Sequence, residues 1–276
     1  MTLNSSNKNL LLERDGDWLT IWFNRPDTRN ALSAEMIQEL HRVIETIVDD
    51  LSVRGVTFRG KGGVFCAGGD LKDFKSIFQD GEIDEAEVAR SNQAGGELYD
   101  KINSLPQVVV MLVDGFAMAG GLGLLCCADV VAVTADAQFA LTETTLGIPP
   151  AQIEPLIVER MGLRTARRLM LTAARFKGAD AVEAGLADFV AADGEGLDAI
   201  EAGIRKQVRK CAPHANAVTK GIVLATRHMS RDEVRAHAAR GFAKCMLGDE
   251  GKEGIAAFME KRKPSWVETG KTESSA

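Results

Sequence analysis

Apolar residues in the first half of the chain occur in short runs that alternate with segments of helical spacing. Runs at residues 9–13 and 18–23, separated by a polar turn, predict a β-hairpin. Ser33 is a typical helix-capping residue, and the apolar spacing from Met36 to Ile47 predicts a helix that continues to Asp50. Strands that alternate with helices favour stacked βαβ units. Further apolar runs predict buried strands at residues 55–59, 108–113, 129–133 and 138–140.

The last part of the chain has a different pattern. From Ile153 onward the apolar spacing is nearly all helical, and no further strand is expected. Such amphipathic helices commonly cap a core or contact neighbouring subunits. We therefore expect a core over residues 1–200 and a C-terminal helical region over residues 201–276. Helix starts are expected at Leu163, Gly178, Leu197, Ala215, Ser230 and Gly251.

One polar stretch, from Leu71 to about Gln93, interrupts the core pattern. Its charged residues and its glycine predict a loop between helices. Loops of this kind often cover binding sites.

Composition and charge narrow the class of protein. The 276 residues, 45% of them hydrophobic, suffice for one large domain, or for a domain with a small appendage. The net charge of -6 shows no excess of the basic residues that bind nucleic acid. No run of eighteen apolar residues and no secretory signal pattern occurs, so we expect no membrane association and a cytoplasmic location. The five cysteines are irregularly spaced and predict neither disulfides nor a metal site.

Two apolar strands run into glycine-rich turns, and these turns are the most informative feature of the sequence. Residues 56–58 precede Phe65-Cys66-Ala67-Gly68-Gly69-Asp70, and residues 108–113 precede a turn in which Gly120-Gly121-Leu122-Gly123 opens a short apolar helix. Backbone amides at a helix start favour negative charge. Two such turns can direct two amides at one oxygen atom. Motifs for phosphate-loop nucleotide hydrolysis, zinc proteolysis and serine hydrolysis do not occur.

Four motifs in this order resemble the crotonase, or enoyl-CoA hydratase/isomerase, family, and the resemblance covers nearly the whole chain. They are Asn24-Arg25-Pro26, Asn30-Ala31-Leu32-Ser33, residues 65–71 and Ala119-Gly120-Gly121, supported by residues 137–139 and 258–263. The resemblance implies an α/β fold, a ClpP-like spiral of ββα units with a C-terminal helical trimerisation region. It places an acyl-CoA site in residues 1–200 and oligomerisation in residues 201–276, as a homotrimer or a dimer of trimers.

The resemblance also implies a reaction. Family members hold a thioester oxygen between two backbone amides, which match Gly69 and Gly120 here. Hydratases of the family usually carry two acid/base glutamates; the second matches Glu143, whereas Gly123 stands at the position of the first. Coenzyme A belongs to the substrate, so no separate cofactor is implied. Glu154 is a further candidate carboxylate, with a surface role as its alternative.

The missing first glutamate leaves two activities open. A double-bond isomerase can work with Glu143 alone, whereas further segments resemble the isohexenylglutaconyl-CoA hydratase branch, which serves acyclic terpene breakdown. Substrates of that branch carry their own distal carboxylate, and water can be oriented by that carboxylate, by Gln152, or by both. The small Gly123 is expected to leave room for a substrate branch. The segments are residues 150–153, 169–176, 212–217 and 258–264.

Contacts to coenzyme A are also implied by the resemblance. A first group of residues, around the first glycine turn, matches the nucleotide and pantetheine path. In relatives an aromatic residue and a lysine of a neighbouring subunit's last helix touch the adenosine. Some relatives bind RNA or act as scaffolds, which the acidic balance and the intact glycine pair disfavour here. The residues that match the nucleotide and pantetheine path are Ala67, Asp70, Leu71 and Lys72. The residues that match the aromatic residue and the lysine of the neighbouring subunit are Phe258 and Lys261.

Overall fold

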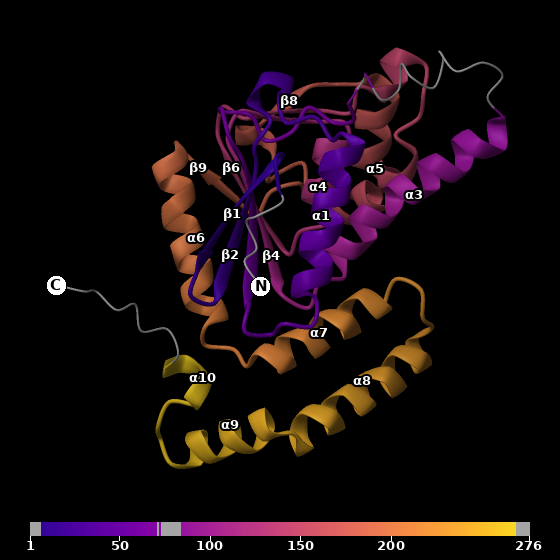
Figure 1. Cartoon of the computed structure of the whole chain (residues 1–276). Helices are drawn as coiled ribbons and strands as arrows, with labels where there is room; N and C mark the ends of the chain where they lie inside the picture. Colours follow the sequence, from indigo (N-terminus) through magenta and orange to yellow (C-terminus); the bar gives the residue numbers. More distant parts are fainter. Residues whose placement is uncertain (1–6, 71, 73–83, 269–276) are drawn as a thin grey trace.

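A six-stranded sheet forms the centre of the molecule in the computed structural model, which describes residues 7–70, 72 and 84–268 (Figure 1). The strand order is β1-β2-β3-β4-β6-β9, with β1 antiparallel to β2 and the other neighbours parallel. The predicted hairpin and the three buried strands that follow it in this sheet are confirmed. Their bounds are β1 Leu10–Asp15, β2 Trp18–Phe23, β3 Gly55–Gly60, β4 Val108–Val113, β6 Val130–Thr134 and β9 Phe189–Ala191.

Helices cover both faces of this sheet, which explains why β4 is apolar on both sides. Helix α1, Ala34–Ile47, lies on one face with α3, Glu85–Asn103, whereas α6, Gly194–Val208, lies on the other (Figure 1). The Ser33 hydroxyl accepts a hydrogen bond from the Met36 amide, so the predicted cap is confirmed. The helix ends at Ile47, three residues before the expected end.

A second, three-stranded sheet contradicts the expectation that only helices follow Ile153. It has the order β5-β7-β8, with β5 Phe116–Met118, the predicted β7 Gln138–Ala140, and β8 Phe176–Lys177. Strands β8 and β9 have two and three residues, too few to show a period in the sequence. Pairing with distant strands defines them instead; Phe176, for example, pairs with Phe139.

The remaining helices are close to the predicted starts. Helix α5, Glu154–Thr172, is interrupted at Gly162, which has a non-helical φ of 75°. The expected helix start, Leu163, is the next residue. Ser230 caps α8 in a reciprocal capping box with Glu233. A 3-10 turn begins at Gly178, as expected. The other helices are α4 Gly120–Cys126, α7 Pro213–Ala225, α8 Arg231–Leu247, α9 Asp249–Met259 and α10 Ser265–Glu268.

The expected loop from Leu71 to Gln93 is only partly within the described residues. Residues 71 and 73–83 lie outside them. From Glu85 onward the chain is helical, because Asp84 caps α3 by accepting a hydrogen bond from the Ala86 amide. The expected loop is therefore helix from Glu85 to Gln93.

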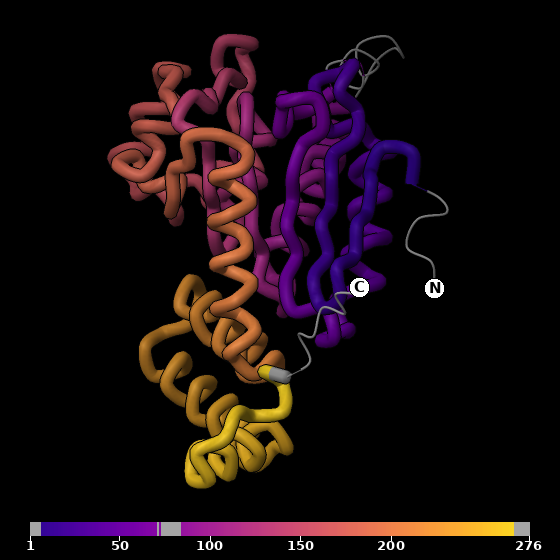
Figure 2. The backbone as a smooth tube through the Cα atoms, turned by 90° about the vertical axis from the view of Figure 1, so that its left-hand side faces the viewer, coloured from indigo at the N-terminus to yellow at the C-terminus, as the bar shows by residue number. Residues whose placement is uncertain are grey.

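Helices α7, α8 and α9 form an arm that extends beyond the sheet (Figure 2). The arm begins at Pro213 rather than at residue 201, because α6 still packs on the main sheet through Leu197 and Ile204. Lys220 ties the arm to the core: its Nζ donates to the carbonyls of Leu105 and Gln107, both at 2.7 Å. No helix among the described residues is long and apolar enough to span a bilayer.

Candidate active site

The two glycine turns pack directly on each other. The Met118 amide of β5 donates to the Cys66 carbonyl at 2.9 Å, which joins the second turn to the first. The Leu32 amide donates to the Gly68 carbonyl at 2.8 Å, and the Asp70 amide donates to the Leu32 carbonyl at 3.1 Å. These two hydrogen bonds form a parallel β-bridge between Leu32 and Gly69, in which the N–H of Gly69 points away from Leu32.

Gly68 makes this close approach possible. Its φ of +93° is unfavourable for residues with a side chain, and a Cβ atom here would lie 2.8 Å from the Cβ of Ala119 and 3.3 Å from the Gly120 nitrogen. Among the described residues, the amides of Gly69 and Gly120 donate no hydrogen bond. Two adjoining turns therefore each carry an amide that is available to a ligand.

Tyr99 supports the second turn, and the sequence analysis did not find it. Its hydroxyl, on the buried face of α3, donates to the Gly120 carbonyl at 3.3 Å. Burial raises the pKa of Tyr99, so the phenol stays protonated. The available signal was that Tyr99 is the only tyrosine and follows the apolar Leu98 in α3.

Glu143 begins a 3-10 turn, Glu143–Leu146, which Leu141 and Thr142 connect to β7. The Ala119 amide donates to the Ala140 carbonyl at 2.9 Å, which brings this turn beside the second glycine turn. The Glu143 Oε2 atom is buried and has no hydrogen-bond partner in the part of the chain that the structure describes. Burial, reinforced by the charge of Glu154, raises the pKa of Glu143. A carboxyl group of this kind can carry a proton closer to neutral pH than an exposed one.

The expected space beside Gly123 is absent, and this expectation was wrong. A Cβ atom at Gly123 would lie 2.4 Å from Cγ2 and 2.8 Å from Cβ of Ile153. Ile153 is only 3% exposed, so its side chain fills the volume in question. The small size of Gly123 had predicted free space at this point of α4. The side chain of Ile153, which directly precedes α5, occupies that space.

Gln152 and Glu154 flank Ile153. The Gln152 Nε2 donates to Asn92 Oδ1 at 2.8 Å, and a Cβ atom at Gly96 would lie 2.6 Å from Gln152 Oε1. The Gln152 side chain thus binds to α3 through this hydrogen bond, and its amide oxygen contacts Gly96. Glu154 opens α5, half-buried, near enough for its charge to act on Glu143.

Comparison with known proteins shows the family of the chain. Residues 14–269 match the family model described as Enoyl-CoA hydratase/isomerase. The chain belongs to this family. The prediction of a crotonase-type α/β fold, and of an enzyme of the enoyl-CoA hydratase type, is thereby confirmed.

Individual members of the enoyl-CoA hydratase/isomerase family align along nearly the whole chain. A putative enoyl-CoA hydratase from Thermus thermophilus is 31% identical over 249 residues, which cover 90% of this chain and 97% of that protein. Pseudomonas aeruginosa AtuE is 46% identical in sequence, with a TM-score of 0.90 over 95% of this chain and all of that chain. An enoyl-CoA hydratase/isomerase from Marinobacter aquaeolei is 39% identical, with a TM-score of 0.91 over the same shares of the two chains.

The residues proposed for coenzyme A from the family resemblance lie in two places. Ala67, half-buried, donates its amide to the Arg29 carbonyl at 3.0 Å in the first turn. Asp70 accepts from Arg25 at 3.0 Å and from the Lys72 amide at 3.1 Å. The carboxylate of Asp70 is therefore used within the protein, while the Lys72 side chain is exposed. Leu71 lies outside the described residues.

Phe258 and Lys261 lie on the arm, apart from the glycine turns (Figure 1). Phe258 is 83% exposed, and Lys261 follows α9 in a left-handed conformation with a φ of 56°. Within one chain these residues do not join the site around Glu143.

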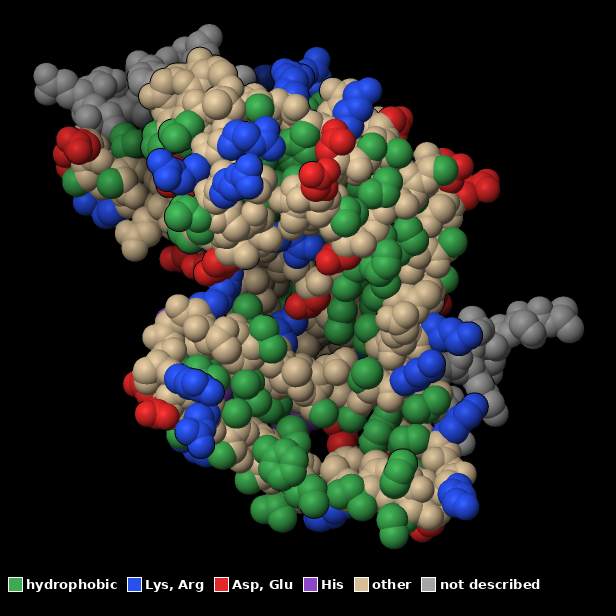
Figure 3. All heavy atoms as spheres, turned by 180° about the vertical axis from the view of Figure 1, so that it is seen from behind, with side chains coloured by type: hydrophobic (Ala, Val, Ile, Leu, Met, Phe, Trp, Pro, Cys, Tyr) green, Lys and Arg blue, Asp and Glu red, His purple; other side chains and the backbone are tan. Residues whose placement is uncertain are grey.

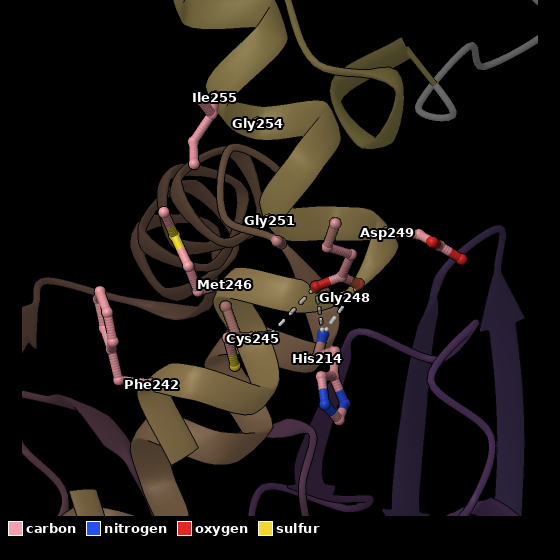
Figure 4. A pocket seen from close by; sticks show the side chains of 12 residues that line it. His214, Phe242, Cys245, Met246, Gly248, Asp249, Gly251, Gly254 and Ile255 are labelled. Atoms are coloured by element: carbon pink, nitrogen blue, oxygen red, sulfur yellow. Dashed lines mark hydrogen bonds between the residues drawn. The ribbon is translucent and has the colours of Figure 1, made fainter. Parts of the chain in front are cut away.

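The arm also contains a pocket of about 420 Å³, lined mainly by apolar atoms (Figure 4). It lies between α7, α8 and α9, and Phe242, Met246 and Ile255 are among the residues that line it. Glu250 caps α7 by accepting hydrogen bonds from the amides of His214 and Ala215. None of the lining residues belongs to the glycine turns or to the Glu143 turn, so this pocket is separate from the candidate active site.

Proposed function

We propose that the protein adds water to a 2-enoyl-CoA thioester. The observation that carries this proposal is the pair of adjoining turns whose Gly69 and Gly120 amides have no hydrogen-bond acceptor among the described residues, beside the half-buried Glu143. Two amides that share the thioester oxygen stabilise the enolate that forms when the double bond is attacked. Removing one donor from such a site typically costs about 3 to 4 kcal/mol of transition-state stabilisation.

In the proposed reaction the oxygen of water bonds to the β-carbon, and the π electrons move onto the thioester oxygen between the two amides. The α-carbon of this enolate then takes the proton that Glu143 carries, and the proton released by the added water restores the Glu143 carboxyl group. The raised pKa of Glu143 supports this role, because the group must hold a proton when the enolate forms.

For the substrate we propose a branched glutaconyl-CoA, such as isohexenylglutaconyl-CoA, in the breakdown of acyclic terpenes. The segments at residues 150–153, 169–176, 212–217 and 258–264 support this choice. We propose that the water is oriented by the substrate's distal carboxylate, by Gln152, or by both. The occupied space beside Gly123 requires the branch to lie elsewhere in the acyl pocket.

A panel of thioesters tests the activity. Purified protein is incubated with crotonyl, 3-enoyl, 3-methylglutaconyl and isohexenylglutaconyl thioesters, while enoyl absorbance and product mass are followed. We expect loss of absorbance and a mass gain of one water, greatest for the glutaconyl compounds. A double-bond shift at constant mass would instead support the isomerase alternative, which the glycine at position 123 favours. Binding without any turnover would support a scaffold role.

The charge of Glu154 provides a test of the Glu143 assignment through pH dependence. Because that charge helps to raise the pKa of Glu143, Glu154→Gln is expected to lower it. The protonated form of Glu143 is the active one, so activity falls as the pH rises through this pKa, and the fall should move to lower pH in the variant. Glu154→Asp retains the charge and serves as the control. Identical pH profiles of Glu154→Gln and wild type would contradict the assignment.

We further propose that the chain acts in the cytoplasm as a homotrimer or a dimer of trimers, with Phe258 and Lys261 reaching the adenosine part of a neighbour's substrate. Apolar side chains gather over the arm in the lower part of Figure 3, and Phe242, Leu247 and Phe258 are between 69% and 83% exposed. Such a large exposed apolar surface is typical of a subunit interface. Light scattering at micromolar concentration should give the mass of three or six chains; a stable monomer would contradict this.

A further inference from the structure

The Gly69 N–H belongs to a peptide group that is held from its other side. In a planar trans peptide the N–H and the preceding carbonyl point in opposite directions, so the Gly68 carbonyl sets the direction of the Gly69 N–H. The Gly68 carbonyl accepts a hydrogen bond from the Leu32 amide at 2.8 Å. The first amide of the candidate site therefore depends on the peptide group that joins Ala31 to Leu32.

A guanidinium group lies at the far end of this arrangement. Arg25 Nη1 donates to the Ala31 carbonyl, which belongs to the same peptide group as the Leu32 N–H. Two peptide groups in series thus connect Arg25 to the Gly69 N–H, which has no acceptor among the described residues. Ala31, Leu32 and Gly68 are buried, whereas Gly69 is exposed. The series is shielded from water along its length and open at the end where a ligand can bind.

Hydrogen bonds in such a series strengthen one another. A charged donor at one end polarises each peptide group in turn, because the peptide dipoles lie head to tail. The positive end of the last dipole is the Gly69 N–H. Negative charge forms on the thioester oxygen only as the enolate forms, so a more strongly polarised N–H stabilises the transition state more than it stabilises the bound substrate.

Asp70 keeps the guanidinium group in this position. Its Oδ2 atom accepts from Arg25 Nη2 at 3.0 Å, and the two side chains are 9% and 19% exposed. Burial by itself raises the pKa of Asp70, but hydrogen bonds from the Lys72 amide and from Arg25 lower it overall, so the carboxylate is ionised at neutral pH. The Asp70 amide also donates to the Leu32 carbonyl at 3.1 Å. The ion pair and the peptide series therefore form one unit.

We propose that Arg25 is a positioning residue of the reaction, which orients and polarises the Gly69 N–H through the two peptide groups that end at Leu32 and Gly69. The inference rests on the proposed function and assigns part of its enolate stabilisation to a charge outside the glycine turns. Loss of this charge is expected to change the rate of the chemical step, whereas loss of a merely structural ion pair would change stability alone.

Arg25→Met tests this role, with Arg160→Met as the matched control. The Arg160 side chain is 15% exposed and likewise binds backbone carbonyls and a carboxylate, which belong to Ala128, Leu186 and Asp188. Both variants should melt at a lower temperature than wild type. Only Arg25→Met should lower kcat, by about tenfold, which is less than the factor of about 10² to 10³ for loss of a donor itself. KM should stay near the wild-type value.

A second variant separates the loss of the guanidinium from the charge that it leaves behind. Arg25→Met deprives the Asp70 carboxylate of its cation, which by itself destabilises the fold. In the double variant Arg25→Met/Asp70→Asn we expect the melting temperature to return toward the wild-type value while kcat stays low. The double variant also carries the test if Arg25→Met is too unstable to purify. A kcat that recovers together with the melting temperature would overturn the inference, because the unpaired carboxylate would then explain the loss.

Infrared spectroscopy of a bound thioester reports on the Gly69 N–H without turnover. Hydrogen bonds to a carbonyl weaken its double bond and lower its stretching frequency. Butyryl-CoA, isotope-labelled at the thioester carbonyl, has no double bond to hydrate and serves as the probe. We expect its carbonyl band to move to lower frequency on binding to wild type and to Arg160→Met. The displacement should be smaller in Arg25→Met and in the double variant.

The outcomes for the wild-type protein separate this inference from the proposed function. If wild type shows turnover and a displaced band, and Arg25→Met has the same kcat and the same band, the role of Arg25 is overturned and the proposed function stands. If wild type shows neither turnover of any enoyl thioester nor a displaced band, the proposed function and the inference are both overturned.

Discussion

Glu143→Gln is expected to lower kcat for the preferred enoyl thioester by about 10² to 10⁴, the usual contribution of a positioned acid/base group. The substitution keeps the size of the side chain but removes the proton that the enolate takes up. KM, or the affinity for a non-reacting acyl-CoA, should stay near the wild-type value, because the two amides are unchanged. Steady-state kinetics by enoyl absorbance, with binding measured by calorimetry, give both quantities.

The control for this experiment is Glu195→Gln, at an exposed glutamate in the first turn of α6. It should leave both kcat and KM unchanged. The Glu143→Gln variant should unfold at a temperature no lower than wild type, because its buried Oε2 atom makes no hydrogen bond within the described chain that the variant would lose. Wild-type hydration by Glu143→Gln would show that another group carries the proton.

Gly68→Ala is expected to lower kcat by about 10² to 10³, because the new methyl group would push the two glycine turns apart. Its carbon would lie 2.8 Å from Ala119 Cβ and 3.3 Å from the Gly120 nitrogen, so the Gly120 amide has to move. The left-handed conformation at Gly68 adds a cost of about 1 to 2 kcal/mol to the free energy of folding. Kinetics and thermal unfolding of the same preparation measure the two effects.

Gly63→Ala separates these two effects. Gly63 has a φ of +70°, similarly left-handed, but an added Cβ meets no atom within 4 Å. We therefore expect Gly63→Ala to lose stability through its backbone conformation alone, with kcat close to wild type. If Gly68→Ala were as active as Gly63→Ala, the spacing of the two turns would not matter for turnover, and the proposed oxyanion site would be wrong.

The sequence predicted the elements that have a local cause. The hairpin that ends at Phe23, the Ser33 cap, the buried strand at residues 108–113 and the helix start at Ser230 depend on neighbouring residues or on a clear period. The order of the glycine motifs was sufficient to predict the family. Strands β8 and β9 escaped prediction, because two or three residues show no period and form only through partners far away in the chain.

The candidate site likewise has features that the sequence determined and features that only distant contacts created. The sequence by itself determined that two glycine turns follow two buried strands, and that one carboxylate, at Glu143, follows a third. Only the tertiary structure brought Tyr99 to the Gly120 carbonyl and Ile153 onto Gly123. Both contacts join segments some twenty to thirty residues apart. A small residue in a sequence shows that space is available, but close packing of the interior decides which distant side chain fills that space.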